Sequence, residues 1–114
     1  MMLLRIIGVV ALLASVPATA QEVSRPEIDG FLTQVKSCWS LSPDDIASGK
    51  TVSVRMALTP AGEIENIEII HPDKSAAGQS LAAGAIRALE RCAPYSFSAE
   101  SYESWKTLEI DLHP

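Results

Sequence analysis

The chain is short of the residues on which most small catalytic and metal sites depend. It has 2 cysteines and 2 histidines among 114 residues, and aromatic residues make up only 5% of it. A structural zinc site needs four such ligands at characteristic spacings, and a dithiol redox motif needs its cysteines two residues apart. Cys38 and Cys92 lie far apart, and no glycine-rich phosphate loop is present. We therefore expect neither a metal nor a cofactor.

Positive charge and long apolar runs are also scarce. The chain has 14 acidic and 9 basic residues, for a formal net charge of −5. This balance would repel phosphate backbones, which excludes nucleic acid as a partner. The longest apolar stretch runs from Ile6 to Val16 and ends before Pro17, well short of the roughly 20 residues of a spanning helix. We expect no stable membrane anchor.

Residues 1–20 have the features of a cleavable signal peptide. Arg5 precedes the apolar run, and the small-residue triplet Ala18-Thr19-Ala20 offers a cleavage site before Gln21. An uncleaved hydrophobic tail is the alternative. Export would leave one domain's length of chain and would place Cys38 and Cys92 in an oxidising compartment, where two cysteines pair by default. The sequence thus predicts one disulfide, with two buried free thiols as the rival interpretation.

Two segments have the periodicity of amphipathic helices. Ser24-Arg25-Pro26-Glu27 forms a capping box with proline in the first turn, so a helix should begin there. Its apolar stripe consists of Ile28, Phe31, Leu32, Val35, Cys38 and Trp39. The second helix spans residues 75–93, is rich in alanine, brings Cys92 to the core and is stopped by Pro94. Trp39 and Trp105 are expected to anchor the core.

Three other segments alternate between apolar and polar residues, as strands with one buried face do. They are residues 52–58, 64–70 and 107–112, and Thr59-Pro60-Ala61-Gly62 supplies a turn between the first two, with a bulge near Glu65-Asn66. The order predicts an α+β fold: a three-stranded antiparallel sheet with two helices packed on one face and a polar opposite face. Residues 21–27 form an extension and helix cap, and residues 28–114 form the domain.

Two connections are predicted as irregular. Ser40 to Lys50 is rich in turn residues, and its Asp44-Asp45 pair lacks the alternating oxygen ligands of a calcium loop, so we expect a solvated surface loop. Tyr95 to Phe97 is expected to lie in a second loop, from which the two aromatic rings could contact a partner.

The order of these pieces resembles the C-terminal domain of TolA and, more distantly, of TonB. Gly49 to Met56 and the following Leu58-Thr59-Pro60-Ala61-Gly62 look like the first hairpin of that family. Cys38-Trp39, Ala85 to Ala88 and Arg91 to Tyr95 resemble the helix ends of its cysteine-paired versions, and Tyr102 to Lys106 with Ile110 to Pro114 resemble its closing strand. The similarity spans about residues 28–114.

The resemblance implies a periplasmic, non-enzymatic protein-interaction domain associated with Tol- or Ton-like cell-envelope systems. The implied partner is an envelope protein, either TolB-like or a short receptor segment, and in several such complexes the partner adds a strand to an exposed sheet edge. We therefore expect docking along the closing strand, which consists of Thr107, Leu108, Glu109, Ile110, Asp111 and Leu112. Because the sequence has no spanning helix and no long linker, we do not expect it to transmit force between membranes.

Two other functions are compatible with the residues. The first is a disulfide-stabilised inhibitor or accessory protein that acts through the loop from Tyr95 to Phe97. The second is a small hydrolase, because Gly78-Gln79-Ser80-Leu81-Ala82 comes within one residue of a nucleophile elbow. Ser80 is expected inside a helix, however, and His71 and His113 are expected to be exposed without a catalytic partner. We therefore predict no enzymatic activity.

Overall fold

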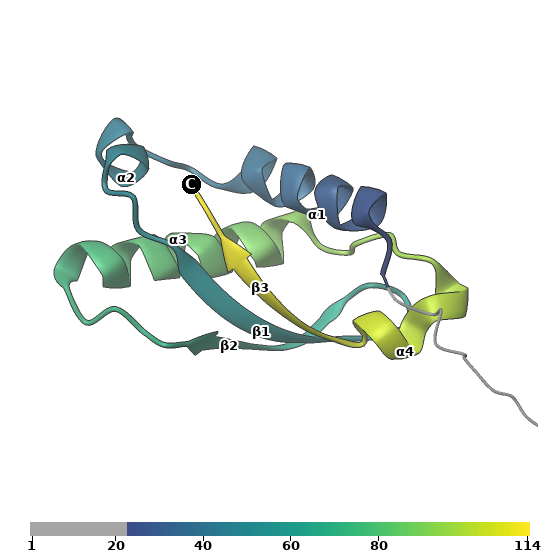
Figure 1. Cartoon of the computed structure of the whole chain (residues 1–114). Coiled ribbons are helices and arrows are strands. Elements are labelled where there is room, and N and C mark those ends of the chain that lie inside the picture. Colours follow the sequence, from purple (N-terminus) through teal and green to yellow (C-terminus); the bar gives the residue numbers. More distant parts are fainter. Residues whose placement is uncertain (1–22) are drawn as a thin grey trace, which may run out of the picture.

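The computed structural model describes residues 23–114, so the predicted signal peptide at residues 1–20 lies outside the described residues. Two long helices and three strands follow one another in the predicted order (Figure 1). They are α1 (Arg25–Cys38), β1 (Val52–Leu58), β2 (Ile64–Ile70), α3 (Ala76–Cys92) and β3 (Thr107–Leu112). Within the described residues, none of the helices combines the length and the hydropathy that crossing a bilayer requires.

The three strands form one antiparallel sheet in the order β2-β1-β3. Hairpin-connected β1 and β2 pair with one irregularity: Ala57 faces Asn66, but Leu58 faces Ile64, which leaves Glu65 as an extra residue. This is the bulge that the sequence predicted. Strand β3 returns to the other side of β1 and pairs with it from Thr107 to Leu112 without a shift. The last strand of the chain is therefore an edge strand.

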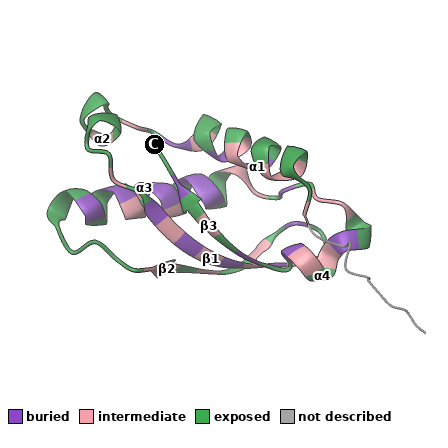
Figure 2. Cartoon of the chain, viewed as in Figure 1, coloured by how far each residue is buried: buried purple, intermediate pink, exposed green. Residues whose placement is uncertain are grey.

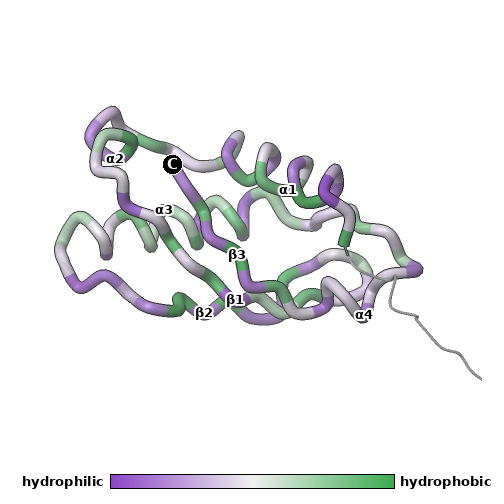
Figure 3. Tube along the Cα trace, viewed as in Figure 1, coloured by the Kyte–Doolittle hydropathy of each residue, from purple (hydrophilic) through white to green (hydrophobic). Residues whose placement is uncertain are grey.

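Both long helices cover the same face of the sheet, as predicted. The side chains of β1 that face the helices are Val52, Val54, Met56 and Leu58, and all of them are buried (Figure 2). Helix α1 packs on α3, and it is hydrophobic on the side toward the sheet and hydrophilic on its outer side (Figure 3). The remaining core residues come from both long helices, from β3 and from the connection before it, while β2 adds only partly buried side chains. The buried ones include Phe31, Val35, Trp39, Leu81, Ala85, Leu89, Tyr95, Trp105, Leu108 and Leu112.

The start of α1 is held by the predicted capping box and by one long-range contact. The Ser24 hydroxyl accepts a hydrogen bond from the Glu27 N–H at 3.3 Å, and the Glu27 carboxylate accepts one from the Ser24 N–H in return. The same carboxylate also accepts the Ser98 N–H at 2.6 Å. These donors, Ser98 first, lower the pKa of Glu27. One side chain thus caps the helix and fixes the segment that leads into β3.

A disulfide joins Cys38, the last residue of α1, to Cys92, the last residue of α3. Two further contacts bridge the same helix ends. The Gln34 side-chain amide donates to the Cys92 carbonyl at 2.7 Å, and the Arg91 guanidinium donates to the Cys38 carbonyl at 3.1 Å. Because helix C-termini leave carbonyls without intrahelical donors, these side chains satisfy groups that the helices themselves cannot.

The structure differs from the sequence prediction in residues 40–50 and in the passage that follows Phe97, both of which contain short helices, whereas Tyr95 to Phe97 is irregular as predicted. Residues 40–50 include α2 (Pro43–Ala47), in which the Asp45 carboxylate accepts the Ser42 N–H at 2.9 Å as part of a capping box. The passage into β3 contains the 3₁₀ turn η3 (Ala99–Ser101) and then α4 (Tyr102–Trp105). Each of these helices is too short to leave a periodic apolar stripe, which is why periodicity missed them.

Tyr95 and Phe97 lie in a segment without helix or strand, as predicted, but the expectation that both rings are exposed to a partner is wrong. Tyr95 is only 3% exposed, and its hydroxyl donates to the Leu89 carbonyl at 2.6 Å. Burial raises the pKa of this phenol. Phe97 is half-buried, with its ring stacked on that of Trp105 at 5.1 Å between centroids. These rings close the end of the core, so the structure gives no support to a function that displays both on a loop.

Candidate binding site at the β3 edge

Strand β3 has one side hydrogen-bonded to β1 and, within residues 23–114, no strand on its other side. The Leu58 N–H donates to the Lys106 carbonyl at 2.8 Å, which fixes the phase of the ladder. In an antiparallel pair the residues alternate between bonding the neighbouring strand and facing away from it. Leu108 and Ile110 therefore direct their N–H and C=O groups toward β1. The outward backbone groups belong to Thr107, Glu109 and Asp111.

The side chains of β3 divide into the same two sets. Leu108 and Leu112 are buried on the helix side of the sheet, and Ile110 is half-buried there. Thr107, Glu109 and Asp111 are exposed on the opposite, polar face. The six residues predicted for docking thus serve two purposes, since three hold the strand on the core while the other three present unpaired backbone groups to solvent.

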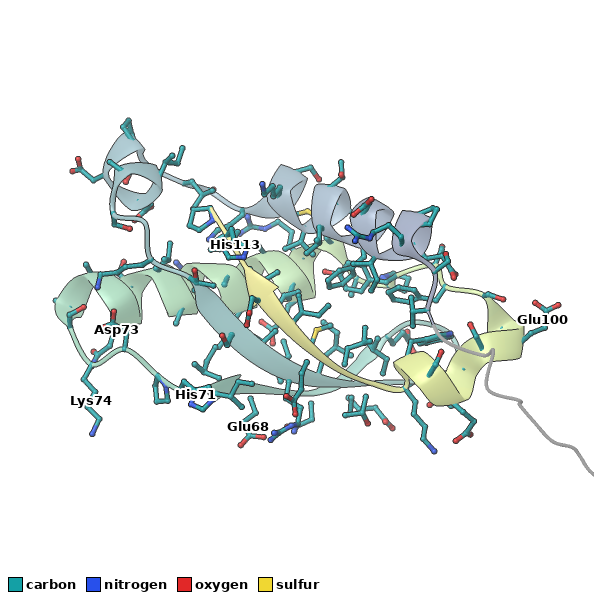
Figure 4. The ribbon with its side chains drawn as sticks, in the orientation of Figure 1. Glu68, His71, Asp73, Lys74, Glu100 and His113 are labelled. Carbon is teal, nitrogen blue, oxygen red and sulfur yellow. A yellow bond between two sulfur atoms is a disulfide. The ribbon has the colours of Figure 1, made fainter. Side chains whose placement is uncertain are left out.

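A groove of about 260 Å³ runs between α1 and the C-terminal end of β3. Its apolar surface comes from Leu32, Val35, Trp39 and Leu112, and its remaining lining residues are Asp29, Thr33, Lys36, Asp111 and His113. All of them belong to α1 with its cap or to the end of β3, so the groove lies where α1 overhangs the sheet edge. His113 marks this end of the strand in Figure 4. A strand added to β3 would have one of its faces turned toward this groove.

The polar face beside this edge carries a shared ion pair. The Arg55 guanidinium lies 2.7 Å from the Glu109 carboxylate and 3.0 Å from the Glu68 carboxylate. These two partners, Glu109 first, raise the pKa of Arg55. In Figure 4 Glu68 projects from the sheet away from the helices. Because all three groups are solvent-exposed, the pairs contribute little to stability, and their effect is mainly on the charge of the surface.

The other sheet edge, β2, is less regular. The bulge at Glu65 interrupts its pairing with β1, and bulges twist an edge away from further pairing. Strand β3 has no such irregularity over the six residues that pair with β1. Of the two edges, β3 therefore offers the longer uninterrupted row of backbone donors and acceptors.

The residues considered for hydrolysis are not assembled. Ser80 lies exposed within α3, and His71 is exposed just after β2 with a φ of 53°. His113, at the end of β3, has its Nδ1 atom 3.2 Å from the Thr51 hydroxyl oxygen. Across residues 23–114 the structure gives no hydrogen bond from either histidine to Ser80, and it has no cluster of three or more histidine, cysteine or carboxylate side chains placed to hold a metal.

The groove is the part of the site that sequence reasoning missed. Leu32, Val35 and Trp39 were all assigned to the stripe of α1 that faces the core. The structure confirms this for Val35, which is fully buried, but Leu32 is half-buried and borders the groove. Periodicity identifies which residues share a face of a helix. It does not say how far that face extends beyond the sheet beneath it.

The fold and this edge define a small α+β domain with one regular, unpaired strand. No protein-family model matches the sequence, and no curated protein matches it. Among solved structures, it is similar to the solution NMR structure of TolA domain III bound to a peptide from the N-terminus of TolB. The match has a TM-score of 0.59 and 17% sequence identity, and it covers 91% of this chain and 81% of that one. The chain therefore has a TolA domain III-like fold.

Proposed function

We propose that this chain is a periplasmic protein-interaction domain without catalytic activity, which binds a cell-envelope protein by accepting a strand at the β3 edge. The observation that carries the proposal is the row of outward backbone groups on Thr107, Glu109 and Asp111 beside an apolar groove. An incoming strand would gain main-chain hydrogen bonds from the edge and would place alternate side chains in the groove, which is the mode of β-strand addition.

Two further observations support this function. The structure with a similar fold, TolA domain III, is in complex with a peptide derived from TolB, so this architecture binds a peptide in at least one protein. The Cys38–Cys92 disulfide is suited to an oxidising compartment such as the periplasm. A TolB-like protein or a short receptor segment is the kind of envelope partner we propose.

A proline at Glu109 tests the docking edge, because it removes one outward N–H while the ladder to β1 keeps its hydrogen bonds. Tagged wild-type protein should capture a specific partner from envelope extracts, and Glu109→Pro should abolish that capture. Glu109→Ala is the matched control: it loses the same ion pair with Arg55 but keeps the N–H, so capture should persist, although weaker.

A proline at Ile110 checks the assigned phase of the strand. Its N–H faces β1, so Ile110→Pro should lower the melting temperature sharply, whereas Glu109→Pro should leave the folded circular dichroism spectrum intact. If Glu109→Pro is folded and still captures the partner as well as Glu109→Ala does, strand addition at β3 is wrong and another surface must bind.

A further inference from the structure

We propose that the strand accepted by β3 is an alternating basic and apolar segment of another protein, and that its basic side chains lie beside Glu109 and Asp111. This inference rests on the proposed function and specifies the chemistry of the partner. Its apolar side chains face α1 and enter the groove, while its cationic side chains lie on the polar face of the extended sheet.

The polar face of the edge has an excess of negative charge. Glu109 shares the Arg55 guanidinium with Glu68, so two carboxylates are balanced by one cation. Asp111 accepts a hydrogen bond from the Ser53 hydroxyl at 2.7 Å, and no Lys, Arg or His nitrogen of the described residues forms an ion pair with it. On a strand the side chains of residues 109 and 111 point to the same face, so the two acids form one stripe along the edge.

Pairing across a sheet depends on the side chains that face one another. Opposite charges on neighbouring strands contribute roughly 0.2–1 kcal/mol per pair, and like charges directly opposite one another are destabilising. A basic residue at every second position of an added strand would lie next to Glu109 and Asp111 in either strand direction. An acidic residue at those positions would be repelled by the Glu109 and Asp111 carboxylates. The net charge of −5 on this chain adds to that repulsion.

The same stripe argues against a second copy of this chain as the occupant. Two β3 strands related by a two-fold axis at Glu109 would place the Glu109 carboxylates opposite one another. Moving the axis to Ile110 would place each Glu109 opposite an Asp111. Both registers oppose like charges on an exposed edge, a device by which sheet proteins avoid edge-to-edge pairing.

The groove sets the requirement for the other face of the added strand. Its apolar lining comes from Leu32, Val35, Trp39 and Leu112, and its volume is about 260 Å³. An engineered apolar cavity of about 150 Å³ is large enough for benzene, so this groove has room for one aromatic or large aliphatic side chain. A charged side chain turned inward would lose hydration against these four apolar residues, which favours the phase that places the apolar side chains on this face.

The test uses segments tethered to the chain, expressed from its full sequence so that any processing occurs normally. Three seven-residue segments are fused after Pro114 through a flexible linker of about 20 Gly and Ser residues, long enough to reach β3 in either direction. All three have valine at odd positions, and the even positions are lysine, glutamate or threonine. Amide hydrogen exchange at Glu109 and Asp111, measured by NMR, reports pairing of the outward N–H groups.

We expect the lysine segment to slow exchange of both amides at least tenfold relative to the glutamate segment, with threonine between them. In the Glu109→Gln, Asp111→Asn double variant the difference between the lysine and glutamate segments should largely disappear. Equal protection by all three segments would overturn the charge preference while leaving strand addition intact. Protection by none of the three, in a chain that remains folded, would overturn both this inference and the proposed docking edge.

Discussion

Loss of the Cys38–Cys92 disulfide should lower the free energy of unfolding by a few kcal/mol. The link spans a sequence separation of 54 residues. For a loop of that length the chain-entropy relation gives about 4 kcal/mol at 25 °C, because the cross-link restricts the unfolded chain. The native helix ends keep two other contacts, from Gln34 and Arg91, so the fold should survive the change. A domain of this size commonly has only about 5–15 kcal/mol in total, so the fraction lost would be large.

The assay is urea unfolding of the Cys38→Ala, Cys92→Ala double variant beside the wild-type protein, each with and without a reducing agent. The wild type should lose 2–5 kcal/mol on reduction, the range typical of small secreted domains. The double variant should be insensitive to the reductant and should match the reduced wild type. Its urea dependence should be steeper, because an unlinked unfolded chain exposes more surface.

Two results would refute this reasoning. The first is a loss below about 1 kcal/mol with an unchanged urea dependence, which would mean that the cross-link restricts the unfolded chain little. The second is a double variant much less stable than the reduced wild type. In that case the cost would arise from native packing of the two side chains and not from the entropy of the unfolded state.

Two further predictions concern single positions. Gly62 has a φ of 82°, and a Cβ there would collide with the Tyr95 carbonyl. Gly62→Ala should therefore lower the free energy of unfolding, measured with a chemical denaturant, by about 2–4 kcal/mol. Gly49→Ala is the control: its φ is 69° but the space around it is open, so the loss should be only about 1 kcal/mol. The Ser98 N–H holds the pKa of Glu27 below its ordinary value of 4.5, so its carboxylate stabilises the fold above that pH and the benefit is lost as the pH falls through the folded pKa. The lead of the wild type over Glu27→Gln in urea midpoint should therefore shrink as the pH falls from 7 into the acid range, whereas a difference that does not change with pH would contradict the prediction.

Much of the fold was predictable because its elements are long enough to show their period. The capping box at Ser24 placed the start of α1, and the strand pattern placed Thr107–Leu112 with the bounds that the structure has. The out-of-phase Ile64 also predicted the bulge in β2. Each of these signals is local, since a cap, a period and a phase change can be recognised without knowing which other segment lies nearby.

Features that depend on distant contacts were not predictable in the same way. Tyr95 lies in the irregular segment that its helix-ending proline predicts, but it is buried there, because its hydroxyl donates to the Leu89 carbonyl and its ring contacts Phe31 at 4.7 Å between centroids. The groove likewise depends on where α1 crosses the sheet edge. Side-chain burial of this kind is set by tertiary packing, which overrides the local preference of a short segment.

The binding edge lies between these two cases. Alternation within Thr107–Leu112 shows which side chains share a face, but it does not show which N–H groups point toward the neighbouring strand and which point away from it. That direction depends on the strand order and on the phase of the ladder, which the pairing of β1 with β3 sets and the hydrogen bond from the Leu58 N–H to the Lys106 carbonyl reveals. Had β3 paired with β1 one residue out of phase, the Glu109 N–H would have bonded to β1 and its side chain would have turned to the core. The side chains of Glu109 and Asp111 lie on the exposed face, and their N–H groups point to the open side, because the chain returns to β1 in this register. One register therefore decides both which backbone groups are free to bind a strand and which charges lie beside them.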